Sequence, residues 1–195
     1  MSRKSYATAL GEVLAPLGFE RDGRQAWSRM AGTVLERVDL QTSQIGGTTA
    51  NLGSWDLATE ELLRQAIAPR EPFGRGYTRI GMLMDGRDRW WKNDPNGPVE
   101  LAAAVALHAP AFFESRRSID AQLRRFGRGQ ARWTNSNTAS RFNLAITLYR
   151  IGEIQEACDA IKTPPRTIPK EWVEEAESIR KWLGCGLLEP PAAAG

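Results

Sequence analysis

The chain has 195 residues, of which 42% are hydrophobic and 25% are charged, and its formal net charge is +3. These values are ordinary for a soluble globular protein, and this length supports a core without a metal or disulfide framework. The small basic excess does not by itself indicate nucleic-acid binding. No run approaches the ~18 apolar residues of a membrane span. The first residues, MSRKSYATAL, also lack the apolar segment of a secretory signal, so we expect a cytoplasmic protein with no membrane partner.

The periodicity of apolar residues predicts a helix over residues 3–17, ended by Pro16 and Gly18. Three strands joined by glycine turns follow over 26–30, 34–43 and 48–55, which predicts an antiparallel meander. Alternation along the second strand places Val34, Glu36, Val38, Leu40 and Thr42 on one face and Leu35, Arg37, Asp39 and Gln41 on the other.

A helix is predicted over residues 57–67, then a loop over 69–76 and a fourth strand over 77–84. Pro98 suits the first turn of a buried helix, which we expect to stop at Pro110. A further helix, capped by Ser118, is predicted to run through Phe126, and three more over 138–151, 153–162 and 170–183.

The chain is therefore predicted to combine an α+β domain with a helical extension. The α+β domain covers residues 1–126 and packs an antiparallel sheet of about four strands with helices. A polar linker over 127–137 leads to the all-helical extension over 138–188, and a disordered tail follows over 189–195.

Five short motifs in the first domain resemble a family of unknown function, number 4304 in the domain-of-unknown-function series. They are Leu17-Gly18-Phe19, Asp39-Leu40-Gln41-Thr42-Ser43, Asn51-Leu52-Gly53, Arg79-Ile80-Gly81 and Asp88-Arg89-Trp90-Trp91. The resemblance covers the N-terminal ~125 residues in order and spacing. It implies an α+β fold and a mainly bacterial origin, and it carries no established activity or catalytic residues.

Residues 143–162 resemble one tetratricopeptide-type helical hairpin. The matching positions are Asn143, Leu144, Ala145, Tyr149, Gly152, Glu156 and Ala157. The chain has no second copy, and one repeat cannot bury its own apolar face. We therefore expect the hairpin to pack on the helix over 170–183 or on the first domain, and its apolar surface leaves a homodimer open.

Polar residues within strand-like runs mark a candidate binding face. Gln41, Ser43, Asn51 and Arg79 converge on one sheet face if their strands are neighbours, with Arg79 as the anion-binding member. The alternative is a hydrogen-bonded structural network. Asp88 leads into Trp90 and Trp91, which face opposite ways in an extended chain, so one indole is an exposed anchor or both belong to the core.

An arginine-rich segment offers a second surface, for nucleic acid. Arg116, Arg117, Arg124 and Arg125 form a local basic excess within residues 116–141, which solvated helix faces also produce. The sequence has a single histidine and no phosphate loop or nucleophile elbow, so we predict no metal, cofactor or catalytic residue.

Cys158 and Cys185 lie outside any CxxC or histidine pattern. Reduced thiols packed as small core residues are the simple interpretation in a cytosol, and the sequence leaves a disulfide open.

We therefore predict a cytoplasmic bacterial binding protein without catalysis, whose partner is another protein and whose role resembles that of an immunity protein. The alternatives are a nucleic-acid-binding protein using residues 116–141, and an enzyme whose site is assembled from the polar residues of the sheet face.

Overall fold

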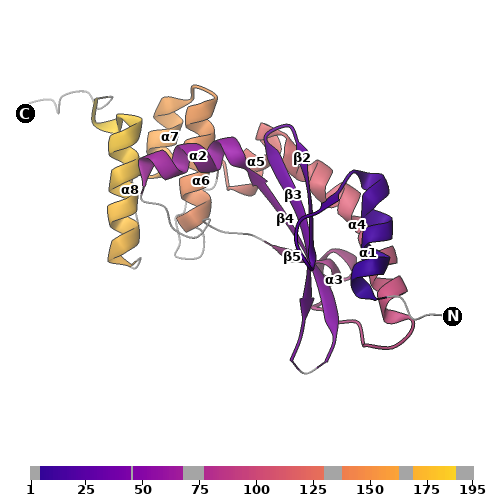
Figure 1. The fold of residues 1–195 in the computed structure, drawn as a ribbon. Helices are drawn as coiled ribbons and strands as arrows, with labels where there is room; N and C mark the ends of the chain where they lie inside the picture. The colour runs from indigo at the N-terminus through magenta and orange to yellow at the C-terminus, as the bar shows by residue number, and fades with distance from the viewer. Residues whose placement is uncertain (1–4, 45, 68–76, 130–137, 163–168, 188–195) are drawn as a thin grey trace, which may run out of the picture. The chain divides into compact units, whose positions relative to one another are not determined.

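A computed structural model describes residues 5–44, 46–67, 77–129, 138–162 and 169–187 (Figure 1). The chain divides into two compact units. Unit 1 comprises Met1–Asp56 with Arg75–Arg117, and unit 2 comprises Leu57–Gly74 with Ser118–Gly195. Unit 1 contains the sheet and the described part of unit 2 is helical, so the chain is α+β, as predicted. Within the described ranges, no helix is long and apolar enough to cross a membrane.

Unit 1 is built on a five-stranded antiparallel sheet with the order β1-β2-β3-β4-β5. The strands are β1 (Glu20–Arg21), β2 (Ala26–Ala31), β3 (Val34–Thr42), β4 (Thr48–Asp56) and β5 (Thr78–Arg79). The three long strands are the predicted ones, and the two-residue strands β1 and β5 extend the sheet at its edges. At the hairpin between β2 and β3, Ala31 pairs with Val34. Gly32 in this turn has a φ of 63°, a left-handed conformation that residues with a side chain rarely adopt.

The alternation along β3 separates the two faces of the sheet, as predicted. The buried set is Val34, Glu36, Val38 and Leu40, and the half-exposed set is Leu35, Arg37 and Asp39. The second set belongs to the face that we call the polar face. The first set faces the core of unit 1.

Two long helices of unit 1 cover the buried face of the sheet (Figure 1). They are α1 (Tyr6–Leu14), which a 3-10 turn η1 (Ala15–Leu17) follows, and α4 (Gly97–Arg117). Ser5 caps α1, because its hydroxyl accepts a hydrogen bond from the Thr8 amide at 3.1 Å. The core joins both helices to the sheet through Leu10, Leu14, Val38, Leu40, Leu52, Val105 and Phe113.

Two of the predicted boundaries in unit 1 are wrong. Helix α4 continues through Pro110, because Phe112 and Phe113 beyond it are buried, which offsets a proline cost of about 3 kcal/mol. The predicted strand over 77–84 ends at Arg79, and Ile80–Met84 forms a short helix, α3. Ile80 is buried in the core, and Leu83 and Met84, three and four residues later, pack against the same core, which is helical spacing.

Unit 2 contains the helices α2 (Leu57–Ala66), α5 (Ile119–Arg125), α6 (Thr138–Arg150), α7 (Ile154–Ala160) and α8 (Lys170–Leu183), and a final 3-10 turn, η3 (Cys185–Leu187). Ser118 caps α5, as predicted. Helices α6 and α7 form a hairpin that packs with α8, and Gly152 in its turn has a φ of 84°.

The unit boundaries differ from the predicted domain boundaries, because α2 and α5 belong to unit 2. The predicted loop over 69–76, most of the linker over 127–137 and the tail over 189–195 lie outside the described residues.

The two cysteines of unit 2 form a disulfide, so the expectation of reduced thiols is wrong. Cys158 lies in α7 and Cys185 begins η3, directly after α8. Packing of these elements brings the two Cα atoms to 5.5 Å, which is within the range that a disulfide spans. Both side chains are buried in the core of this unit.

Candidate functional site

The polar face brings together residues from three neighbouring strands. In the register of β3, β4 and β5, Asp39 lies opposite Asn51, and Asn51 lies opposite Arg79. Gln41 is two residues beyond Asp39 on the same face, and its Oε1 accepts a hydrogen bond from Asn51 Nδ2 at 3.0 Å. The structure therefore places Gln41, Asn51 and Arg79 on one face, as the predicted convergence requires.

Arg79 is the centre of the exposed part of this face. Its guanidinium forms an ion pair with Asp88 and lies 5.1 Å from the centre of the Trp90 ring. The side chains of Arg79 and Asp88 are 36% and 49% exposed, so water reaches both charges. An arginine held between a carboxylate and an indole is a preoriented donor for a partner's acceptor groups.

A close backbone approach at Gly81 positions Asp88 and the tryptophans. A Cβ atom at Gly81 would lie 2.5 Å from the Arg87 carbonyl oxygen, so the turn after α3 packs directly against the backbone of this helix. The chain then meets the edge of β4, where Thr48 and Trp91 exchange two backbone hydrogen bonds of 2.8 and 2.9 Å. These two contacts fix the segment that contains Asp88.

Trp90 and Trp91 face opposite sides of the sheet, which is one of the two alternatives predicted for adjacent residues in an extended chain. Trp91 is 6% exposed and belongs to the core, so the structure removes it from the candidate binding residues. Trp90 is half-buried and contacts Arg79 on the polar face. Ser43 lies in the turn beyond β3, where its amide donates to the Gly47 carbonyl at 2.9 Å, so it is outside the paired strands that hold Gln41, Asn51 and Arg79.

Sequence reasoning missed an ion-pair chain in the middle of the polar face. Arg37 Nε donates to Asp39 at 3.0 Å, and Arg37 Nη1 lies 2.6 Å from Asp22. Partial burial acts to lower the pKa of Arg37, but the hydrogen bond to Asp39 and the charges of both carboxylates outweigh it, so this pKa lies above its usual value. The alternation along β3 had already placed Arg37 and Asp39 beside Gln41, and that signal could have identified them.

An aromatic pair lies at the other end of the polar face. The rings of Trp55 and Tyr77 meet edge to face at a centroid distance of 5.3 Å, and both residues are half-buried. The indole lies across Gly53, where a Cβ atom would come within 2.1 Å of it. The face therefore has a charged and amide-bearing centre between Trp55 at one end and Trp90 at the other.

The four arginines of the alternative nucleic-acid surface divide between the two units. Arg117 binds Glu36 and Glu114, and Arg116 donates to the Phe112 carbonyl while its guanidinium lies 3.7 Å from the Phe112 ring centre. These two belong to unit 1, whereas the exposed Arg124 and Arg125 belong to unit 2.

In the ranges that the structure describes, no group of three or more His, Cys, Asp or Glu residues is arranged to bind a metal ion. The chemistry available on the polar face is that of fixed hydrogen-bond donors, acceptors and aromatic surfaces.

The fold and this face define unit 1 as an α+β domain with helices on one side of an antiparallel sheet and polar groups on the other. Residues 10–105 match the family model of the Domain of unknown function (DUF4304), which confirms the predicted resemblance for the N-terminal part of the chain. No curated protein and no solved structure matches the chain. The resemblance of α6 and α7 to a tetratricopeptide hairpin stays a prediction.

Proposed function

We propose that this chain is a non-catalytic interaction protein whose polar face recognises another protein. The observation that supports the proposal is the arrangement of Arg79 between Asp88 and Trp90 beside the Asn51–Gln41 pair. Tryptophan, tyrosine and arginine are the residues that contribute most to binding energy in protein interfaces. A half-exposed group of this composition fits a protein surface better than a buried small-molecule site.

The proposed setting is the bacterial cytoplasm, and an immunity-like role, in which the face blocks a partner protein, is its specific form. The disulfide between Cys158 and Cys185 weighs against the cytoplasm, because disulfides persist mainly in oxidising compartments. Alkylation of thiols in protein purified under non-reducing conditions, read by mass spectrometry, distinguishes two free thiols from a bond.

The experiment for the interaction is a tagged pull-down from native lysate with and without nuclease, followed by a direct titration of each recovered protein. Trp90→Ala and Arg79→Ala should each reduce affinity about tenfold or more, since each truncates a central contact. Arg64→Ala is the matched control, because Arg64 is an arginine of α2, in unit 2, whose side chain is 55% exposed. Trp91 is not substituted, because replacing this buried side chain could unfold the protein, and loss of folding would then be mistaken for loss of binding.

Three outcomes separate this proposal from its alternatives. A partner that survives nuclease and is lost in Trp90→Ala and Arg79→Ala supports the polar face. Recovery of nuclease-sensitive material alone would favour the nucleic-acid alternative, for which Arg124 and Arg125 remain exposed. An empty lane from folded protein, followed by stabilisation by a small molecule that Arg79→Ala abolishes, would favour the enzyme alternative on the polar face.

A further inference from the structure

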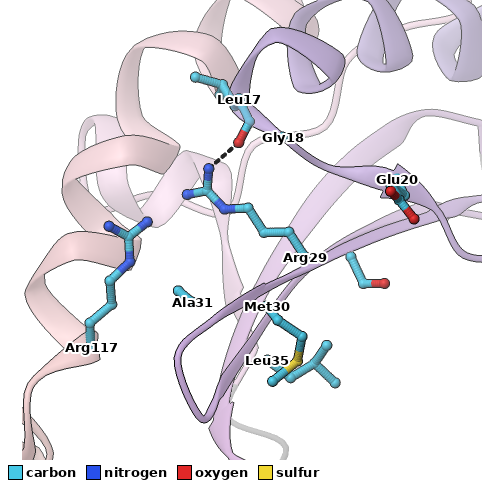
Figure 2. Close-up of a pocket in the computed structure, with 9 residues that line it drawn as sticks. Leu17, Gly18, Glu20, Arg29, Met30, Ala31, Leu35 and Arg117 are labelled. Carbon is cyan, nitrogen blue, oxygen red and sulfur yellow. Dashed lines mark hydrogen bonds between the residues drawn. The ribbon is translucent and has the colours of Figure 1, made fainter.

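A separate cavity of about 600 Å³ opens at the β2 edge of unit 1 (Figure 2). Arg29 of β2 and Arg117 at the end of α4 line one end of it, and their guanidinium groups extend toward each other. Leu17 and Ala31 line the cavity on the same side of β2 as Arg29, and Met30 and Leu35 line it from the opposite face of the sheet. We call this cavity the arginine pocket. It lies at the β1–β2 side of the sheet, whereas Trp90 contacts the β4–β5 side.

One buried carboxylate holds both guanidinium groups of the arginine pocket. Glu36 is 0% exposed, and its Oε2 lies 2.6 Å from Arg29 Nε, while its Oε1 lies 2.6 Å from Arg117 Nε. The hydrogen bond to Glu36 is the main reason why the pKa of Arg117 lies above its usual value. Glu36 alone compensates only one of these two positive charges, and an anion stabilises the other.

Arg29 keeps hydrogen-bonding capacity that the described residues do not use. Its Nε donates to Glu36, its Nη1 donates to the Leu17 carbonyl, and its guanidinium lies 4.4 Å from the Phe19 ring centre. A guanidinium has five N–H donors. In the described part of the chain, no hydrogen bond from Arg29 Nη2 is found, and the side chain is 18% exposed. This nitrogen is therefore available to a ligand in the pocket.

Glu114 occupies the place that a ligand would take at Arg117. Its carboxylate lies 2.5 Å from Arg117 Nη1, but its side chain is 73% exposed. An exposed ion pair of this kind contributes little stability, so a ligand carboxylate can replace it. Glu20 also lines the pocket as an exposed acid, which disfavours a ligand with more than one negative charge.

From these contacts we propose that the arginine pocket binds a small molecule with one carboxylate and an apolar body. The carboxylate would lie between Arg29 and Arg117, matching the one charge that Glu36 leaves uncompensated, and the apolar body would contact Leu17 and Ala31, which lie on the Arg29 side of β2. This site does not depend on the proposed function of the polar face, and the two can fail independently.

The test is a titration of the full chain with N-acetyl-leucine, followed by two-dimensional ¹⁵N NMR. Expected are saturable shifts of the Ala31 amide and the Arg29 Nε–H signal, with a Kd on the order of 1 mM for so small a probe. N-acetyl-leucinamide lacks the negative charge and should produce no saturable shift. Inorganic phosphate should bind more weakly than the carboxylate.

Variants connect the signal to the pocket. Arg117→Gln should weaken binding about tenfold, because it removes one charged donor, and Glu114→Gln should tighten it by removing a competitor. Arg24→Gln, at an exposed arginine outside the pocket lining, is the charge-matched control and should leave the Kd unchanged. Trp90→Ala should also leave it unchanged. The proposal is wrong if no saturation occurs, if the amide or phosphate binds as tightly, or if Arg117→Gln has no effect.

Discussion

Replacing Glu36 with alanine tests the charge cluster of unit 1 most directly. The side chain of Glu36 is fully buried and forms short contacts with two arginines whose side chains are 18% and 33% exposed. Removing one partner of a buried ion pair costs about 3–5 kcal/mol, because the remaining charge loses its compensation. Since Arg117 reaches water, we expect a loss near the lower end, about 3 kcal/mol of the free energy of unfolding.

Urea denaturation of protein containing 5-fluorotryptophan measures this loss for unit 1 alone. The ¹⁹F signal of Trp27, which is 3% exposed, reports on unit 1, and that of Trp172 reports on unit 2. Separate signals are needed because a chain with two units need not unfold in one step. Glu36→Ala should lower the urea midpoint at Trp27 and leave the midpoint at Trp172 nearly unchanged.

The matched control is Glu114→Ala, which removes a carboxylate from the same Arg117. Because this side chain is 73% exposed, its loss should cost less than about 0.5 kcal/mol. If Glu36→Ala and Glu114→Ala lowered the midpoint at Trp27 equally, burial would not govern the strength of these pairs and the reasoning would be refuted.

Four further changes have directions fixed by the structure. Trp91→Ala should lower the free energy of unfolding of unit 1 by about 3–5 kcal/mol in urea titrations, and a much smaller loss would contradict its place in the core. Gly81→Ala should cost about 1–3 kcal/mol, because its Cβ atom would meet the Arg87 carbonyl, whereas Gly11→Ala in α1 should raise the melting temperature, since its nearest contact would be 3.5 Å away. Reducing the disulfide, which closes a separation of 27 residues, should destabilise unit 2 by about 3.5 kcal/mol in denaturation with and without reductant; equal midpoints would refute this.

The long strands could be predicted from the sequence because one side of each contacts the core and the other contacts water. In β3, this alternation assigned every residue from Val34 to Gln41 to its observed face. The short strands β1 and β5 have two residues each, too few for any periodicity to appear. The continuation of helix α4 through Pro110 could not be predicted, because it depends on the burial of aromatic residues beyond the proline. Helix propensity describes each residue locally and carries no information on tertiary packing.

Part of the candidate site was also predictable from the alternation of core-facing and water-facing residues along the strands. Gln41, Asn51 and Arg79 could be grouped because polar residues in strands indicate a solvent-facing side. The Arg79–Asp88 pair could not be derived, because it depends on how the chain turns back at Gly81. Glu36 was assigned to the buried face, but its two arginine partners come from β2 and from the end of α4, whose length was mispredicted.

The two candidate sites use one arrangement at two levels of burial. Arg29 lies between Glu36 and the Phe19 ring, and Arg79 lies between Asp88 and the Trp90 ring. Because the cluster around Arg29 is buried, it contributes to the stability of unit 1 as well as lining the arginine pocket. Substitutions at Arg29 or Glu36 should therefore alter stability strongly. The exposure of Arg79 and Asp88 implies that their ion pair contributes less than about 1 kcal/mol to folding. Binding through the polar face can therefore be measured with Arg79 variants that stay folded.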